Sequence, residues 1–397
     1  MKDRNHLSDI GMVHQVQMIT NGLVDIPMLQ LLSPDGVEQD HEQCPELSQE
    51  VSEKILKTMH YIRILDERMI AAQRQGRISF YLACTGEEAA TIGSAAALEP
   101  QDMILSQYRE QGSLAYRGYT TKQFMDQMFS NQKDPNKGRQ MPIHYGDKDL
   151  NFMTISSPLG TQIPQASGYA YGQKMAGLDA LTICYFGEGA ASEGDFHAGL
   201  NMAAVLHCPV IFLCRNNGYA ISTPAEEQFA GDGIASRGIG YGVRTIRVDG
   251  NDVLAVYAAT KQAREIALKE NCPVLIEAMT YRLAAHSTSD DPSGYRSKEE
   301  EAKWKLKDPL LRFEKWMKSK GWLDEKAIKQ FASESRQEVL QTLKQVEKEP
   351  VNSIEDIIED VYDTPPWHLK EQLQSLKQHI RQYPDAYPKT SGRIKND

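Results

Sequence analysis

LTICYFGEGAASEGDFHAGLNMAAVLHCPVIFLCRNNGYAIST, residues 181–223, is the most informative stretch of this chain. Its apolar start predicts a strand over 181–186 that runs directly into Gly187-Glu188-Gly189. A helix is expected from near Ser192, and a second apolar strand over 209–214 precedes the turn of residues 215–219, RNNGY. This order predicts neighbouring parallel strands whose carboxyl ends carry ligand-binding groups.

The residue types in these two turns suit a diphosphate and a divalent metal. Gly187 and Gly189 let the backbone approach a ligand closely, and the helix that follows offers N–H groups and a positive dipole end. Magnesium prefers six oxygens in an octahedral array. Glu188, the amide oxygen of Asn217 and the carbonyl of Tyr219 would leave positions for two phosphate oxygens and a water. A lone Gly-x-Gly or Asn-Gly is ordinarily a tight turn, whereas the whole ordered pattern is specific.

Composition excludes several classes of protein. The 397 residues carry a net charge of -10 without a long basic run, which disfavours nucleic acid and anionic membranes as partners. No apolar run reaches the length of a membrane span. The six cysteines are scattered without a C-x-x-C pair and are expected to be buried reduced thiols. The first residues lack signal-peptide and transit-peptide patterns, so we expect a cytoplasmic protein, or a trimmed mature form, which would then lie in the mitochondrial matrix.

The chain is expected to divide into three regions: an N-terminal arm over 1–48, an α/β domain over 49–300, and a helical C-terminal extension and tail over 301–397. Within 49–300, apolar strands alternate with helical patterns, which predicts a mostly parallel sheet with helices on both faces. The apolar segment 26–32 in the arm must pack on a partner or on the body of the protein.

Four further segments make a family resemblance specific: SQYRE (106–110), TISSPLGTQIP (154–164), EAMTYRL (277–283) and HSTSDDPSGYRS (286–297). Together with the first stretch they resemble the alpha subunits of thiamine-diphosphate-dependent 2-oxoacid dehydrogenases, and most closely the branched-chain branch. The resemblance covers roughly residues 50–385. Many proteins that bind this cofactor carry Asp between the two glycines; Glu188 stands there in this chain, as in one branch of the family.

The resemblance implies a set of site residues. Those expected to bind thiamine diphosphate are Gln107, Tyr108, Arg109, Ser157, Leu159, Glu188, Gly189, Ala190, Arg215, Asn217 and His286. Magnesium would be held by Glu188, Asn217 and Tyr219, and a monovalent cation, K⁺, by Ser156, Pro158, Thr161 and Gln162. Phe80 and Leu159 would border the pocket for the acyl group. Taken singly, an arginine here is usually in a surface ion pair, an apolar residue is usually core, and the K⁺ residues match a polar turn at a helix start equally well.

His286 is the catalytic candidate that the resemblance implies, because it would lie over the cofactor and steer the acyl group onto a lipoyl arm. A neutral imidazole exchanges protons near pH 7. Ser287 matches a serine that is phosphorylated in mitochondrial relatives, and a phosphate there would repel the substrate carboxylate. Without a kinase it is a loop serine.

The activity that the resemblance implies is oxidative decarboxylation of small branched-chain 2-oxoacids, such as 3-methyl-2-oxobutanoate, with acyl transfer to the lipoyl group of an acyltransferase core. A separate beta subunit would supply the glutamate that activates the cofactor, in an assembly of two alpha and two beta chains. The nearest rival is a pyruvate dehydrogenase alpha subunit, because one methylene is worth only ~1–3 kcal/mol. A non-catalytic regulatory subunit and a free-standing transketolase-like enzyme fit less well.

Overall fold

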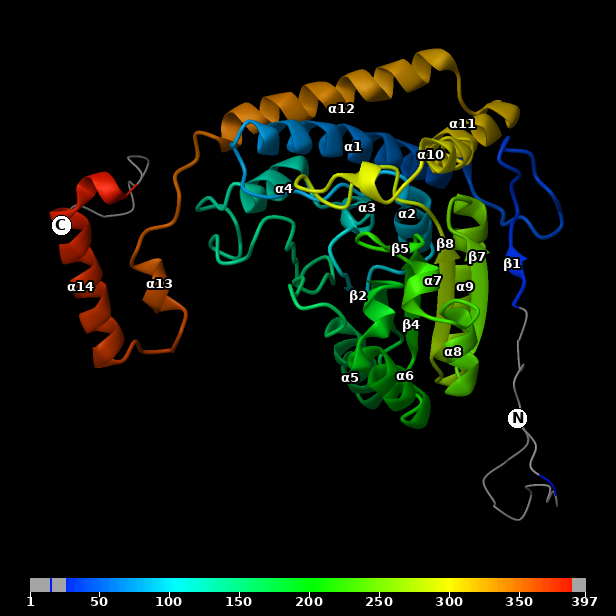
Figure 1. The fold of residues 1–397 in the computed structure, drawn as a ribbon, viewed down its shortest axis with the longest axis horizontal. Helices are drawn as coiled ribbons and strands as arrows, with labels where there is room; N and C mark the ends of the chain where they lie inside the picture. The colour runs from blue at the N-terminus through cyan, green and yellow to red at the C-terminus, as the bar shows by residue number, and fades with distance from the viewer. Residues whose placement is uncertain (1–14, 16–25, 388–397) are drawn as a thin grey trace.

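The computed structural model describes residue 15 and residues 26–387, whose centre is one six-stranded parallel sheet (Figure 1). The strand order is β1-β7-β8-β4-β3-β2. The strands are β1 (Met28–Leu29), β2 (Met103–Leu105), β3 (Thr182–Gly187), β4 (Val210–Asn216), β7 (Arg244–Asp249) and β8 (Val274–Met279). A separate antiparallel pair joins β5 (Tyr219–Ala220) to β6 (Thr223–Pro224). The predicted parallel sheet is confirmed.

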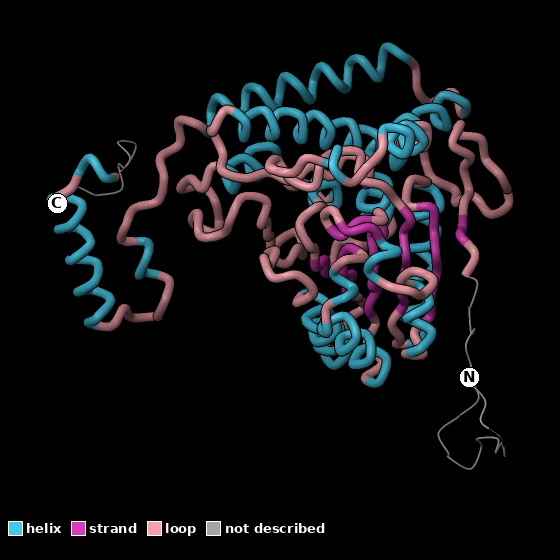
Figure 2. The backbone as a smooth tube through the Cα atoms, viewed as in Figure 1, coloured by secondary structure: helices cyan, strands magenta, loops and turns pink. Residues whose placement is uncertain are grey.

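Helices cover both faces of the sheet, as Figure 2 shows in cyan around the magenta strands. On one face lie α1 (Gln49–Arg74), α2 (Glu88–Ala96) and α9 (Val253–Glu270), and on the other lie α5 (Gln162–Met175), α6 (Gly194–Val205) and α8 (Ala235–Gly240). Every residue of β4 is buried, as expected of a central parallel strand covered twice. The short helices α3 (Gln111–Tyr116), α4 (Thr121–Met128) and α7 (Ala225–Gln228) complete this region.

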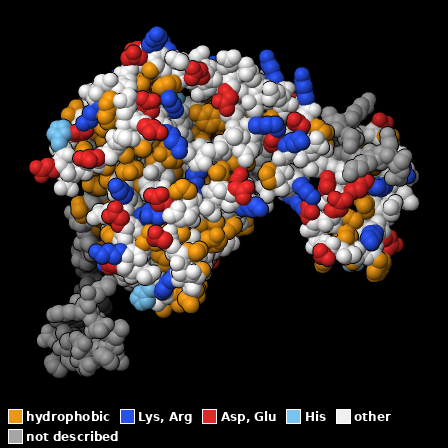
Figure 3. Space-filling view, turned by 180° about the vertical axis from the view of Figure 1, so that it is seen from behind, with side chains coloured by type: hydrophobic (Ala, Val, Ile, Leu, Met, Phe, Trp, Pro, Cys, Tyr) orange, Lys and Arg blue, Asp and Glu red, His pale blue; other side chains and the backbone are white. Residues whose placement is uncertain are grey.

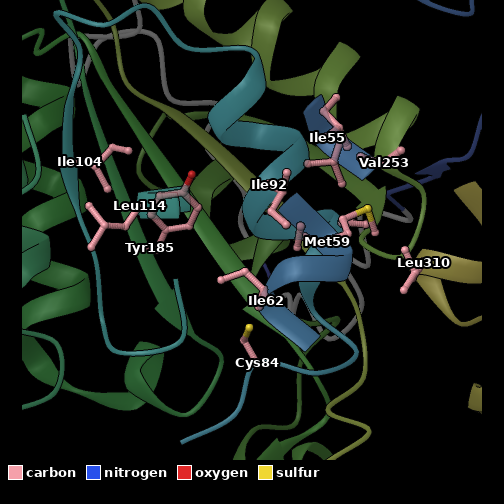
Figure 4. Close-up of a cluster of buried hydrophobic side chains, with 14 of the residues drawn as sticks. Ile55, Met59, Ile62, Cys84, Ile92, Ile104, Leu114, Tyr185, Val253 and Leu310 are labelled. Carbon is pink, nitrogen blue, oxygen red and sulfur yellow. The ribbon is translucent and has the colours of Figure 1, made fainter. Parts of the chain in front are cut away.

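The larger core forms around α1, which packs on the helices α2, α3, α11 (Pro309–Ser319) and α12 (Glu325–Val346). Figure 4 shows Ile55, Met59 and Ile62 of α1 lying against Ile92 of α2 and Val253 of α9. The helix is placed by its start, because the Ser48 side chain accepts a hydrogen bond from the backbone N–H of Val51. Its apolar residues recur every three to four positions, so one continuous stripe is buried.

The segment around β1 packs on the body of the protein, one of the two outcomes expected from the sequence. Met28 and Leu29 pair in parallel with Arg247 and Val248 of β7. The Asp252 carboxylate caps α9 and also accepts the backbone N–H groups of Leu31 and Leu32, at 2.7 and 2.6 Å. The other part of the predicted arm, residues 1–14 and 16–25, lies outside the described residues, and so do most of the first residues, which are predicted to lack a targeting pattern.

Replacing Leu32 with alanine is expected to lower the free energy of unfolding by about 2–5 kcal/mol, because the side chain is fully buried and would leave a cavity. Chemical denaturation of the assembled protein measures this loss. Val37→Ala is the matched control, since Val37 is 60% exposed and its loss should change little. Equal stability of the two variants would contradict the packing of this segment.

The C-terminal region begins against the body and then leaves it. It comprises α10 (Lys298–Lys305), α11 (Pro309–Ser319), α12 (Glu325–Val346), α13 (Asp356–Glu359) and α14 (Trp367–Gln382). The long α12 lies along α1, whereas α13 and α14 form a projection that Figures 1 and 3 show clearly. Residues 388–397 of the predicted tail lie outside the described residues, and the predicted boundaries at 48 and 300 stay a prediction.

In the described part of the chain, no helix is both long and apolar enough to cross a membrane. All six cysteines are free; four are buried, as predicted, while Cys44 and Cys272 are only half-buried.

Candidate active site

The carboxyl ends of four adjacent strands carry most of the residues that the sequence singles out. The loop 106–110 follows β2, Glu188 and Gly189 follow β3, Asn217 follows β4, and the segment that reaches His286 follows β8. In an open parallel sheet, ligands bind outside this edge. The fold therefore gathers residues that are far apart in the sequence.

Glu188 has one carboxylate oxygen in use and one free. Its Oε2 accepts a hydrogen bond of 3.3 Å from the backbone N–H of Asn217, whereas the buried Oε1 has no partner among the described residues. Burial raises the pKa of this carboxyl above its ordinary value. An unpaired buried carboxylate oxygen is costly, and a bound cation would relieve that cost. The donor set therefore fits a metal ion at this position.

The two residues after Glu188 are small for a steric reason. A Cβ at Gly189 would lie 2.7 Å from the Cβ of Ala220, so no larger residue fits without a shift. Ala190 is buried in the short 3₁₀ turn 190–192 that precedes α6. The turn thus keeps the backbone close to the edge where Glu188 lies.

The side-chain amide of Asn217 is fixed by its neighbours. Its Nδ2 donates to Glu87 Oε1 at 2.7 Å, while its Oδ1 accepts the backbone N–H of Tyr219 at 3.2 Å. A carbonyl oxygen has two lone pairs, so Oδ1 can accept one more partner. The Tyr219 hydroxyl donates to Glu300 at 2.9 Å, which anchors the turn that carries the Tyr219 carbonyl.

Arg215 is buried between two carboxylates. Its Nη1 donates to Glu87 Oε2 and its Nε donates to Glu110 Oε1, both at 2.5 Å. Burial would lower the pKa of the guanidinium, but Glu110 and Glu87 raise it above its ordinary value. The side chain is therefore held as a fixed cation at the end of β4.

Glu110 also shapes the loop after β2. Its Oε2 accepts three backbone N–H groups, those of residues 107, 108 and 109, each at 3.0 Å. The Gln107 side chain then reaches the end of β3, where its Oε1 accepts the N–H of Gly187 at 2.7 Å. The roles of Glu87 and Glu110 could not be assigned from the sequence, although Glu110 lies within the segment 106–110 that carries the family resemblance.

Arg109 links this loop to His286. The Arg109 side chain is buried, its Nη1 donates to the Ala83 carbonyl, and its Nη2 lies 3.1 Å from His286 Nδ1. Because a guanidinium only donates, His286 Nδ1 must accept, and the proton of the neutral ring is on Nε2. Tyr108 packs edge-on against the same imidazole, with ring centroids 6.3 Å apart.

His286 is held in its neutral form. Burial, Arg109 and Arg282 lower the pKa of the imidazole to about 3. The ring can therefore donate a hydrogen bond from Nε2 over the whole neutral range of pH.

This pKa predicts a pH dependence of stability. Below pH 6.5 the unfolded chain binds a proton at this residue and the folded chain does not, so the free energy of unfolding falls as the pH drops from about 6.5 toward 3. With the partial exposure of the ring, the loss at pH 5 should be below about 2 kcal/mol. Denaturation of His286→Asn at pH 7 and pH 5 should lack this component, whereas His197→Asn on the exposed surface of α6 should retain it. A wild-type drop that His286→Asn shares in full would contradict the prediction.

The loop after His286 is closed by Asp290, whose Oδ2 accepts from the His286 backbone N–H at 2.7 Å and from the Tyr295 hydroxyl at 2.6 Å. Ser287 lies within this loop, with its Oγ 3.1 Å from that of Ser289. The loop therefore presents Ser287 one residue from the imidazole.

A second group of predicted residues lies before α5. Thr161 Oγ1 is 3.2 Å from the Pro158 carbonyl and 3.3 Å from Ser156 Oγ, and Gln162 Nε2 donates to the Tyr185 carbonyl of β3. These oxygens form the turn in which K⁺ is expected, and its occupancy stays a prediction. Across the described residues, no group of three or more His, Cys, Asp and Glu side chains could hold a metal.

The residues predicted to line the cofactor and acyl pockets make fewer hydrogen bonds with the rest of the site than Glu188 or Asn217 does. Ser157 Oγ lies 2.7 Å from His144 Nε2, and Leu159 is 41% exposed. Phe80 is half-buried against the core on the α1 side. A cavity of about 700 Å³ adjoins Ser156, Ser157 and Pro158. The acyl-pocket role of Phe80 and Leu159 stays a prediction.

Comparison with known families identifies the class of protein. Residues 56–355 match the family described as dehydrogenase E1 component, and the chain belongs to that family. Membership implies thiamine diphosphate as the cofactor. The resemblance found in the sequence motifs is thereby confirmed.

Three similar proteins carry the same name. The 2-oxoisovalerate dehydrogenase subunit alpha of mouse mitochondria is 50% identical over 93% of this chain and 84% of its own length. The mitochondrial proteins of the same name from Caenorhabditis elegans and Dictyostelium discoideum are 51% and 52% identical, each over 91% of this chain, and over 84% and 83% of their own lengths.

Proposed function

We propose that this chain is the alpha subunit of a branched-chain 2-oxoacid dehydrogenase, which decarboxylates acids such as 3-methyl-2-oxobutanoate and passes the acyl group to a lipoyl arm. One observation carries the proposal: Glu188, Asn217, Arg215 and His286 meet at the carboxyl edge of one parallel sheet. The names of the relatives, which are about half identical to this chain, support the branched-chain substrate.

Thiamine diphosphate and Mg²⁺ fit the residues at this edge. Among the described residues Glu188 Oε1 is a buried acceptor without a partner, and Asn217 Oδ1 has a lone pair left. Arg109 and Arg215 bring two fixed positive charges, as a diphosphate requires. The further contacts that we propose for the cofactor are those of Gln107, Tyr108, Ser157, Leu159, Gly189 and Ala190, with the Tyr219 carbonyl on the metal and K⁺ near Thr161.

When bound, the cofactor would supply the electron sink for the electron pair that the loss of carbon dioxide leaves behind. The protein's part is to bind and orient. His286 Nε2 carries a proton and would face the substrate carboxylate and the incoming lipoyl sulfur, while Arg109 fixes the opposite ring nitrogen. Phe80 and Leu159 would limit the acyl pocket. Phosphorylation of Ser287 would add about two negative charges beside His286 and repel the substrate.

A beta subunit is the partner that this function requires, in an assembly of two alpha and two beta chains that docks on a lipoyl acyltransferase core. A surface suited to protein contact lies on the neighbouring helices α5 and α6, where large apolar side chains are exposed: Tyr169, Tyr171, Met175, Met202 and Val205. Trp367 of α14 is also exposed.

We infer a mitochondrial location rather than a cytoplasmic one, because the relatives bear mitochondrial names. Fractionation of the source cells, followed by detection of this chain, tests the location. Recovery with cytosolic markers would overturn it.

The deciding experiment is to co-express this chain with its beta subunit and to assay decarboxylation of 3-methyl-2-oxobutanoate and pyruvate with an artificial electron acceptor. The assay is run with and without thiamine diphosphate and Mg²⁺. Cofactor-dependent activity that prefers the branched acid is expected. A preference for pyruvate would move the chain to the pyruvate dehydrogenase alpha subunits. An assembled complex without turnover of either acid would favour a regulatory subunit.

A further inference from the structure

Two consecutive asparagines end β4 and begin the turn after it, and each is held by a buried carboxylate. Asn216 Nδ2 donates to Glu277 at 2.8 Å, and Asn217 Nδ2 donates to Glu87 at 2.7 Å. Each of these carboxylates also receives a guanidinium, Arg247 on Glu277 and Arg215 on Glu87. The two arrangements are alike in chemistry, but only Asn217 adjoins Glu188.

We propose that Glu87 is a positioning residue for the metal: its carboxylate fixes the Asn217 amide so that Oδ1, and not Nδ2, is the atom offered to the cation. The inference rests on the proposed function, in which Asn217 is a metal ligand. Glu87 is not proposed as a ligand: its Oε1 accepts from Asn217 and its Oε2 accepts from Arg215, so it would act on the metal through Asn217.

The physical reason is that a carboxylate only accepts hydrogen bonds. If the Asn217 amide turned over, its Oδ1 would face Glu87 Oε1, and two acceptors would meet in a fully buried place. The turned amide would also point an NH₂ group at the position of the metal. Glu87 therefore excludes the orientation that cannot bind a cation, and Arg215 keeps Glu87 in place from the other side.

This arrangement predicts an unusual effect for Glu87→Gln. The glutamine oxygen should keep the bond to Arg215, because the guanidinium is charged and only donates. The glutamine NH₂ then faces Asn217 and favours the turned amide, which accepts from it through Oδ1. The metal should lose its amide ligand, although residue 87 keeps its size and shape.

A second substitution should restore binding. In the double variant E87Q/N217D, one carboxylate oxygen introduced at position 217 can accept a hydrogen bond from the amide NH₂ introduced at position 87. The other oxygen remains for the metal. Alone, Asn217→Asp places two carboxylates against each other and should weaken binding, even though it adds a negative charge next to a cation. The rescue depends on orientation, which a merely structural role for Glu87 would not produce.

The test titrates Mn²⁺ into the alpha–beta complex with excess thiamine diphosphate and measures free Mn²⁺ by electron paramagnetic resonance. We expect Glu87→Gln to weaken Mn²⁺ binding by about 10- to 100-fold, the range for partners that orient a ligand. The double variant should recover most of that loss. The matched control is Glu277→Gln, which breaks the same kind of contact at Asn216 and should leave Mn²⁺ affinity unchanged. Size-exclusion chromatography reports assembly of every variant.

The outcomes separate the two proposals. A wild-type complex that binds no Mn²⁺ with thiamine diphosphate would overturn the proposed cofactor function and this inference with it. Tight wild-type binding that Glu87→Gln leaves unchanged would overturn the positioning role alone, as would a weak double variant that assembles normally. If Glu87→Gln alone fails to assemble, the double variant decides: wild-type-like Mn²⁺ binding supports the inference, and weak binding overturns it.

Discussion

Replacing Glu188 with glutamine should abolish the Mg²⁺-dependent binding of thiamine diphosphate to the assembled enzyme. The substitution keeps the size of a buried side chain but removes the only carboxylate of the proposed metal ligands. It thereby removes the negative charge of Oε1, which has no other partner among the described residues. Affinity for the cofactor should fall by more than the factor of about 10 to 100 that is typical when a partner of a metal ligand is removed, because here a direct ligand is lost. Isothermal titration with the cofactor at fixed Mg²⁺ measures it.

The control for this variant lies on the same turn. Glu193 is exposed at the start of α6, five residues after Glu188, and Glu193→Gln removes the same charge from the same segment. It should bind the cofactor as the wild type does. If Glu188→Gln also binds normally, the metal site proposed at the end of β3 is wrong.

Replacing His286 with alanine should reduce the overall reaction with a lipoyl substrate by about 10²- to 10⁴-fold, the usual contribution of a positioned proton donor. The Nε2 proton and the side-chain contact with Arg109 are both lost, while the bond from Arg109 to the backbone carbonyl of residue 286 and the other residues proposed to bind the cofactor are kept. Decarboxylation measured with an artificial acceptor should therefore fall less than acyl transfer. Parallel assays of the two half-reactions with the same preparation check this difference.

His197→Ala provides the comparison, because His197 is an exposed histidine of α6 whose Nδ1 lies 2.8 Å from the Tyr241 hydroxyl. Both half-reactions should continue at the wild-type rate in that variant. Equal losses of the two half-reactions in His286→Ala would argue that the residue supports the loop as a whole and has no separate part in acyl transfer.

Much of the architecture could be read from the sequence because it depends on local pattern. The strand predicted over 181–186 is observed over Thr182–Gly187, and the helix expected near Ser192 begins at Gly194 after a short 3₁₀ turn. In these segments burial on both faces and a Gly-rich turn leave few alternatives. The strand β1 could not be predicted in the same way, because two residues carry no periodicity and their partners in β7 lie about 219 positions away.

Site residues could be predicted from the sequence where they directly follow a strand. Glu188 and Asn217 could be chosen from their turns, whereas Glu87 and Glu110 could not be assigned a role. Both are acidic residues that would ordinarily be exposed, and they are buried because Arg215 lies between them. One signal was available: a guanidinium at the end of a buried strand needs acidic partners. Which acids they are depends on contacts 105 and 128 residues apart in the chain.

The attachment of β1 bears on the order in which this chain can complete itself during synthesis. The backbone carbonyls of Leu32 and Ser33 accept hydrogen bonds from Arg312, which is synthesised about 280 residues later. The earlier partners of this segment, β7 and Asp252, are made about 220 residues after β1, and an unpaired strand edge invites pairing with other chains. A nascent chain stalled before β7 would therefore carry an apolar segment over 26–32 without its partner strand, and one stalled before α11 would lack only the bonds from Arg312. Exposed apolar surface of this kind is what chaperones bind, and the contact of Arg312 with Leu32 joins residues about 280 positions apart in the chain.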